Sequence, residues 1–148
     1  MTSPKYQLKA EPDLTIFEFV SEGVKGQIPK LIEFTETNLK GFYNLAFGDK
    51  DKSTGKINDR IITNNGDTEK VLATVVGAVF AFTDKYPDAW VYATGSTKSR
   101  TRLYRIGINK YFDELSSTFH IFGEFEEKWI PYSKEIEFEG YVVKRKND

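Results

Sequence analysis

The sequence contains no cysteine, a single histidine and no long apolar run. Without cysteine the chain forms no disulfide, holds no metal through thiolates and has no thiol nucleophile, and it fits a reducing compartment as easily as any other. His120 alone excludes sites that need two imidazole groups, and we assign it no catalytic role. The apolar runs stay below the roughly 20 residues that a membrane span requires, and the N-terminus lacks the apolar core of a signal peptide. We expect a cytoplasmic protein with no membrane partner, no metal and no cofactor.

The length of 148 residues is that of a chain with one hydrophobic core. No repeat, low-complexity tract or linker divides the chain. We therefore expect a single α+β domain over residues 1–148, with residues 1–10 and 145–148 mobile.

Hydrophobic patterning predicts a largely antiparallel or mixed β-sheet of about six to eight strands, with two α-helices packed on one face. Runs that mix β-branched, aromatic and charged residues predict strands at residues 15–20, 30–35, 41–49, 57–63, 90–94, 119–125, 128–131 and 138–144. The charged, glycine-containing segment 50–56 between two of these strands suits the tip of a hairpin.

Two segments have the pattern of a helix. The first covers residues 68–86, with Asp67 or Asn65 as its N-cap, and it is apolar almost all round. Small residues along one side of this helix allow a second helix or another subunit to approach closely. The second helix is expected to begin after Thr97 or Ser96, since both are good N-cap residues, and to reach about residue 115.

The formal net charge is −1, so any electrostatic function depends on local segregation of charge. Residues 97–112 carry five basic side chains and no acid, whereas residues 113–139 carry eight acids and two lysines. This contrast predicts either a basic binding surface or an ordinary basic helix beside an ordinary acidic hairpin.

The most distinctive segment runs from Val91 to Lys110, where a strand turns through a glycine into the N-terminus of a helix. Free backbone N–H groups and the positive end of the helix dipole meet at such a turn, and both favour an anion. Gly95 allows close approach of the backbone, and the planar guanidinium groups of the arginines match phosphate oxygens. The segment is not a P-loop, because it lacks the spacing of the Walker motif and its Gly-Lys-Ser/Thr ending. The residues expected to bind a ligand are Gly95, Ser96, Thr97, Arg100, Thr101, Arg102, Tyr104 and Arg105.

Helical spacing separates the three arginines. Arg102 and Arg105 fall on one stripe with Lys98, whereas Arg100 falls on the packed side with Tyr104. A buried arginine needs an anionic partner. Arg100 therefore either contacts a ligand or forms an ion pair with an acid such as Asp88 or Glu69.

Three stretches of the chain resemble a family of small bacterial proteins catalogued only as a domain of unknown function. They are residues 64–75 (NNGDTEKVLATV), 86–90 (YPDAW) and 95–107 (GSTKSRTRLYRIG), of which the last is the most specific. The resemblance covers nearly the whole chain and implies a bacterial, cytoplasmic protein. The family's notable residues fall at Gly95, Ser96, Thr97, Arg100, Thr101, Arg102 and Tyr104. No activity and no catalytic residue come with the resemblance.

We favour binding of a phosphate-bearing ligand through the segment from Gly95 to Arg105, with nucleic acid ahead of a phosphorylated small molecule. One alternative is a small metal-independent ribonuclease of toxin type, in which the three arginines stabilise the scissile phosphate and Tyr104 or Tyr111 aids proton transfer. The other is a protein-interaction module of a bacterial two-component system, whose basic stripe docks an acidic partner or the chain's own acidic hairpin. A protein partner and a homodimer both remain open.

Overall fold

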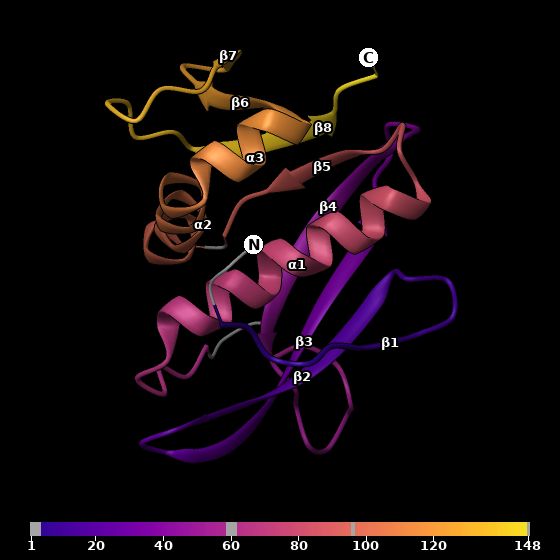
Figure 1. Ribbon diagram of the computed structural model, residues 1–148, viewed down its shortest axis with the longest axis vertical. Helices are drawn as coiled ribbons and strands as arrows, with labels where there is room; N and C mark the ends of the chain where they lie inside the picture. Colours follow the sequence, from indigo (N-terminus) through magenta and orange to yellow (C-terminus); the bar gives the residue numbers. More distant parts are fainter. Residues whose placement is uncertain (1–3, 59–61, 96, 148) are drawn as a thin grey trace.

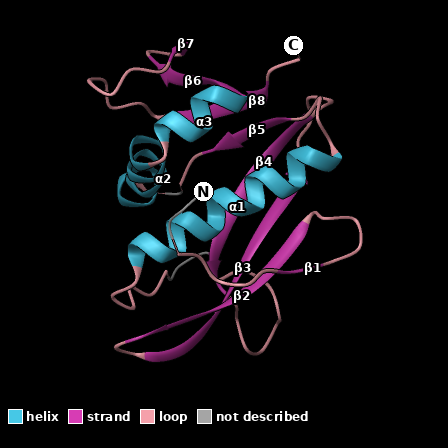
Figure 2. Ribbon diagram, in the orientation of Figure 1, coloured by secondary structure: helices cyan, strands magenta, loops and turns pink. Residues whose placement is uncertain are grey.

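The structure, a computed structural model, describes residues 4–58, 62–95 and 97–147. In this part of the chain, eight strands form one mixed sheet, and three helices lie on a single face of it (Figure 1; Figure 2). The predicted α+β class is therefore confirmed. None of the described helices is long and apolar enough to cross a membrane.

The sheet has the order β1-β2-β3-β4-β5-β8-β6-β7. Neighbouring strands are antiparallel except for β4 and β5, which are parallel and are connected through α1. The strands are β1 (Lys9–Ala10), β2 (Ile16–Gly23), β3 (Gly26–Glu36), β4 (Phe42–Asp49), β5 (Trp90–Ala93), β6 (Phe119–Phe125), β7 (Lys128–Pro131) and β8 (Gly140–Arg145). The helices are α1 (Thr68–Lys85), α2 (Lys98–Lys110) and α3 (Phe112–Thr118).

Two predicted elements differ from the structure. The strand expected at residues 57–63 is absent from the described part of that range, where Ile57 forms only an isolated bridge with Lys50. Thr63 instead turns its backbone N–H and its hydroxyl toward the Asp49 carboxylate, so it has no ladder partner. The single second helix is in fact two helices, because the backbone leaves helical geometry at Tyr111. This break allows both Tyr111 and Leu115 to be buried.

The hydrophobic core lies between the sheet and the helices. Alternate residues of each strand point toward the helices, as period-two patterning requires. The ring of Phe34 on β3 stacks on Phe82 of α1, with 4.2 Å between ring centroids. Ile32 and Phe82 are fully buried. Truncating a residue of this kind to alanine typically costs about 2–5 kcal/mol.

The N-terminal segment packs against the small-residue side of α1, where a second helix or another subunit was expected. The backbone N–H of Tyr6 donates to Thr74 Oγ1 at 2.8 Å. Lys5 lies beside Gly77, at which an added Cβ would be 3.6 Å from the lysine side chain. At the other end of the chain, Arg145 donates to Thr83 Oγ1 and to the Phe80 carbonyl. Hydrogen bonds thus hold Tyr6 and Arg145, which lie in the two segments expected to be mobile.

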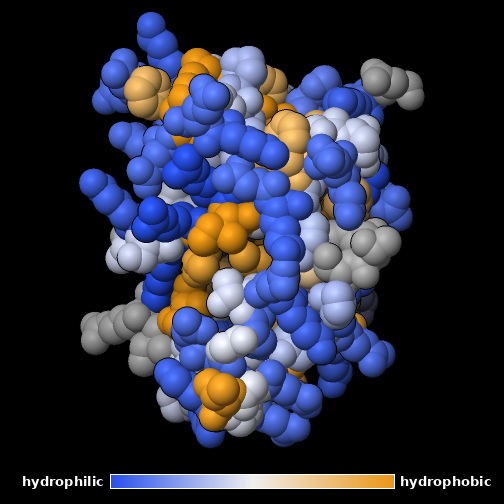
Figure 3. Space-filling model, turned by 60° about the vertical axis from the view of Figure 1, so that its left-hand side comes forward, coloured by the Kyte–Doolittle hydropathy of each residue, from blue (hydrophilic) through white to orange (hydrophobic). Residues whose placement is uncertain are grey.

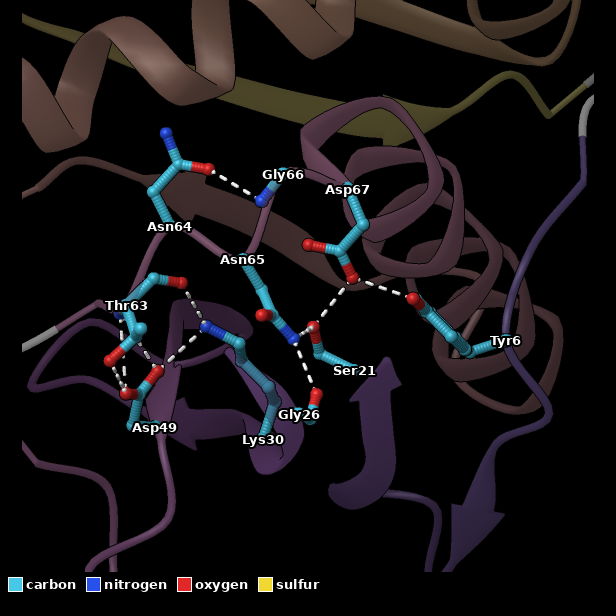
Figure 4. Close-up of polar contacts among 10 residues, drawn as sticks. All are labelled: Tyr6, Ser21, Gly26, Lys30, Asp49, Thr63, Asn64, Asn65, Gly66 and Asp67. Atoms are coloured by element: carbon cyan, nitrogen blue, oxygen red, sulfur yellow. Dashed lines mark hydrogen bonds and ion pairs between the residues drawn. The ribbon is translucent and has the colours of Figure 1, made fainter. Parts of the chain in front are cut away.

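Polar side chains tie the N-terminus of α1 to strands β2, β3 and β4 (Figure 4). Asp67 occupies the predicted N-cap position but makes no capping hydrogen bond. Its carboxylate accepts from the hydroxyls of Tyr6 at 2.6 Å and Ser21 at 2.5 Å. The Asn65 amide donates to Ser21 and to the Gly26 carbonyl. The capping residue therefore fastens α1 to the sheet and the N-terminal segment.

A buried ion pair completes this network (Figure 4). Lys30 on β3 is 1% exposed, and its ammonium group lies 2.7 Å from Asp49 at the end of β4, whose side chain is 13% exposed. The ammonium also donates to the Thr63 carbonyl at 2.8 Å. Burial raises the pKa of Asp49, but the hydrogen bonds from Lys30 and Thr63 outweigh that effect and hold the pKa below its ordinary value.

Replacing Lys30 with methionine is expected to lower the free energy of unfolding by about 3–5 kcal/mol at neutral pH, because Asp49 is left as an unpaired buried charge. Since the pKa of Asp49 is depressed in the folded state, the contribution of the pair is fully present above 3.8, the ordinary value, and is lost as the pH falls through the folded-state value. Urea unfolding at several pH values measures this loss.

Lys50→Met is the matched control, because Lys50 pairs with Glu18 at 2.9 Å while both side chains are about one-third exposed. Its loss should be below about 1 kcal/mol. Equal losses in the two variants would contradict the assignment of stability to burial of the Lys30 pair.

Candidate functional site

The turn after β5 places the backbone against α2. A Cβ added to Gly95 would lie 2.2 Å from the Cβ of Arg100 and 2.6 Å from the backbone nitrogen of Thr101. No side chain fits at such distances. Glycine is therefore required at position 95 by contact between the turn and the first turn of α2.

Two of the N–H groups expected to meet an anion already have acceptors within the chain. Thr97 is the N-cap, as predicted, and its side chain accepts from the Arg100 N–H at 3.2 Å. The Gly95 N–H donates to Thr101 Oγ1 at 3.0 Å. Ser96 lies outside the described residues. The turn is thus closed by its own hydrogen bonds, so a ligand here depends chiefly on side chains.

A cleft of about 530 Å³, which we call the Arg105 cleft, lies beside this turn. One wall comes from the turn and α2, and the opposite wall comes from residues 137–139 and β8. Its lining consists of Thr94, Gly95, Thr97, Lys98, Thr101, Arg102, Arg105, Glu137, Phe138, Glu139 and Tyr141. Figure 3 turns the side of the molecule that carries α2 toward the viewer, and apart from an apolar hollow this side is largely hydrophilic.

The wall opposite α2 is held by two contacts. Phe138 packs on β6 where Gly123 has no side chain, since a Cβ there would lie 2.2 Å from the phenyl ring. The Thr94 hydroxyl donates to the Glu139 carbonyl at 2.9 Å, which joins the end of β5 to this segment. With Phe138 turned into the core, Glu137 and Glu139 on either side of it are exposed.

Two buried polar atoms belong to residues that line the cleft. Among the described residues, Arg105 Nε and the Tyr141 hydroxyl are buried side-chain atoms that form no hydrogen bond of acceptable geometry. Both residues line the Arg105 cleft. The guanidinium is held in place by Nη2, which donates to the Lys134 carbonyl at 3.0 Å. An unsatisfied buried polar group costs about 1–3 kcal/mol, so two of them in one cleft need a physical reason.

The Tyr141 phenol is protonated at neutral pH. Its pKa is raised to about 12, chiefly by burial and also by nearby Tyr132, although Arg105 and a hydrogen bond from the Phe138 backbone act in the opposite direction. Tyr141 is 1% exposed and lies on the core side of β8. Its hydroxyl is therefore a buried hydrogen-bond donor in a residue that lines the cleft.

Arg100 and Tyr104 line a different hollow on the other side of α2, which we call the Tyr104 pocket. It encloses about 340 Å³, and apolar residues such as Phe47 and Ile62 also line it. Gly95 borders both hollows. Burial raises the pKa of Tyr104 to about 12, with Arg100 opposing the increase. The two groups of residues separate along the stripes that helical spacing predicts.

Seven of the eight residues predicted to bind a ligand are described, and they divide between the two hollows. Gly95, Thr97, Thr101, Arg102 and Arg105 line the Arg105 cleft, whereas Arg100 and Tyr104 do not. Glu69, one of the acids expected to pair with Arg100, forms an ion pair with Lys110. No group of three or more histidine, aspartate or glutamate side chains is arranged to hold a metal in the described part of the chain.

Comparison with known proteins places the chain in a family. A family model described as a family of unknown function, DUF6934, matches residues 2–146. The chain belongs to this family. Membership in DUF6934 confirms the resemblance seen in three stretches of sequence. No curated protein and no solved structure gives a significant match, so the DUF6934 assignment brings no activity with it.

The part of the site that the sequence did not reveal is the wall formed by Glu137, Glu139 and Tyr141. These residues lie more than 30 positions after Arg105 in the chain. The one available signal was Tyr141 itself, because an inward-facing tyrosine in a buried strand must find a partner for its hydroxyl. The pattern does not predict where the hydrogen-bond partner of the Tyr141 hydroxyl lies.

Substituting Gly95 with alanine should lower the free energy of unfolding by at least about 2 kcal/mol, because the new methyl group collides with α2. Gly107→Ala is the control in the same helix. A Cβ there would lie 3.6 Å from Leu72, an ordinary contact distance, and alanine is favoured over glycine in a helix interior by about 1 kcal/mol. Thermal unfolding of both variants measures the difference, and a stable Gly95→Ala protein would rule out the close contact.

Proposed function

We propose that the chain binds a phosphate-bearing ligand in the Arg105 cleft. The observation that supports this most strongly is the pair of buried polar atoms without partners, Arg105 Nε and the Tyr141 hydroxyl. A ligand oxygen that accepts hydrogen bonds from either group would remove a desolvation cost already present in the free protein.

The chemistry of the lining favours an oxyanion. Arg105 and the protonated phenol of Tyr141 are donors, and charge-assisted hydrogen bonds from arginine are stronger than neutral ones. Lys98 and Arg102 are exposed on the same wall and add positive charge at the mouth. Arginine is well suited to phosphate because its planar donors match the oxygens of the group.

The volume of the cleft falls in the range of small-molecule sites, roughly 300–1,000 Å³. A phosphorylated small molecule and one nucleotide of a single-stranded nucleic acid both suit this size. We retain nucleic acid as a ligand class for that reason. A cytoplasmic location also belongs to the proposal, and the absence of cysteine is compatible with it.

The two alternatives gain unequal support. A ribonuclease of the expected type needs Tyr104 or Tyr111 beside the arginines, but Tyr104 lines the other pocket and Tyr111 is buried with its hydroxyl 3.5 Å from the Glu69 carbonyl. For an interaction module, the hydrogen bond from Arg105 to Lys134 supports docking of α2 on the chain's own acidic segment. That contact leaves the Arg105 cleft open beside it.

Titration with inorganic phosphate should produce saturable amide chemical-shift changes at Gly95, Thr97 and Thr101, which border the cleft. Arg105→Ala should weaken binding at least about tenfold, because a hydrogen bond to a charged group contributes about 1.5–3 kcal/mol. Lys128→Ala is the control, since it removes the same charge from an exposed position on the edge strand β7.

The proposal that the ligand is a nucleic acid is tested by letting short single-stranded RNA compete with inorganic phosphate at increasing salt concentrations. An apparent affinity that falls steeply with salt is the expected result. Shifts that do not saturate, or equal losses in the Arg105 and Lys128 variants, would show only diffuse attraction of anions and would contradict the proposed site.

A further inference from the structure

The two unsatisfied donors among the residues that line the Arg105 cleft are buried. Tyr141 is 1% exposed and belongs to β8, which is flanked by β5 and β6 in the middle of the sheet. Arg105 Nε is also buried. A ligand group that meets both must enter between α2 and residues 137–139. It must therefore project from the rest of the ligand, as an end group does.

Charges at the mouth of the cleft restrict what can lie alongside that group. Glu137 and Glu139 are exposed on one wall, opposite Lys98 and Arg102 on the other. A polynucleotide that presented an internal phosphate would bring its neighbouring phosphates close to these two carboxylates. Exposed charges act on one another over roughly 8 Å at physiological salt, so a neighbouring phosphate on the acidic side would be repelled.

The number of acceptor oxygens points in the same direction. A phosphate monoester has three terminal oxygens and a charge of about −1.5 to −2 at neutral pH. An internal diester has two such oxygens and carries a single negative charge. With three oxygens, one group can accept from Arg105 and from Tyr141 and still face the basic side chains at the mouth.

We propose that the Arg105 cleft takes a terminal phosphate monoester and rejects an internal phosphodiester. This inference rests on the proposed function and narrows it to one class of ligand. The ester oxygen then points outward, and the remainder of the ligand lies at the mouth between the acidic and basic walls.

The direct test uses two single-stranded oligonucleotides of the same short sequence, one with a 5′-phosphate and one with a 5′-hydroxyl. Titration calorimetry of the whole chain with each, beside inorganic phosphate, measures the discrimination. The 5′-phosphorylated strand should bind at least about tenfold more tightly, which corresponds to 1.4 kcal/mol. In an NMR titration, the 5′-phosphorylated strand should shift the amide signals of Gly95, Thr97 and Thr101, as inorganic phosphate does.

Tyr141→Phe supplies a readout that a purely structural role would not produce. The variant should lose at least about threefold in affinity for the 5′-phosphorylated strand. It should also melt about 2–4 °C higher than the unaltered chain, because it removes a buried O–H donor that has no acceptor in the free protein. Opposite changes in binding and stability are typical of a group retained for function.

Tyr86→Phe is the matched control. The Tyr86 hydroxyl has a partner, the Asp13 carbonyl at 2.8 Å, and it lies at the far end of α1. This variant should bind both strands normally and should melt no higher than the unaltered chain. A rise in melting temperature for both tyrosine variants would overturn the role given to the Tyr141 hydroxyl.

The acidic wall is tested with the double variant E137Q and E139Q. Its affinity for the 5′-hydroxyl strand should rise severalfold, while its affinity for inorganic phosphate changes less. The difference in affinity between the 5′-phosphorylated and 5′-hydroxyl strands should therefore become smaller. Equal binding of the two strands by the unaltered chain would overturn this inference and leave the proposed function standing. Absence of binding by both strands and by inorganic phosphate would overturn both.

Discussion

Contact between the Thr94–Gly95 turn and the first turn of α2 determines where the side chains of α2 lie at the candidate site. Because Gly95 has no side chain, the backbone comes so close that a Cβ would lie 2.2 Å from that of Arg100. Hydrogen bonds from Gly95 to Thr101 and from Arg100 to Thr97 hold the two parts together. The start of α2 is thereby fixed against the end of β5, with Arg102 and Arg105 lining the Arg105 cleft and Arg100 lining the Tyr104 pocket.

This contact lies beside β4 and β5, the one parallel pair among the described strands. β4 and β5 run in the same direction, so their C-terminal ends meet at one edge, and each is followed by a helix. Ligands of open sheets with helical connections commonly bind outside such strand ends. β8 then runs antiparallel beside β5 and delivers residues 137–141 to the opposite wall. A basic helix and an acidic segment that are distant in sequence therefore face each other across a cleft.

Local patterns were sufficient for most of the fold. Runs of strand-forming residues predicted β2 to β8, capping chemistry predicted Thr97 or Ser96 as the N-cap, and helical spacing separated Arg102 from Arg100. Local patterns failed where a polar side chain had two competing uses. Asp67 occupies the capping position, yet its carboxylate binds Tyr6 and Ser21, and both partners are distant in the chain. Thr63 similarly binds Asp49 and not a neighbouring strand.

The amino-acid order determined which residues would form the turn, the helix and its basic stripe, because caps, glycine geometry and helical periodicity act over only a few residues. The sequence also contains the three stretches that resemble the family. Only the folded chain decided that Tyr141, Glu137 and Glu139 stand opposite that stripe, and that Arg105 rather than Arg100 belongs to the cleft. The reason is that contacts across the cleft join positions more than 30 residues apart. Such contacts depend on strand order and packing, which no local pattern encodes.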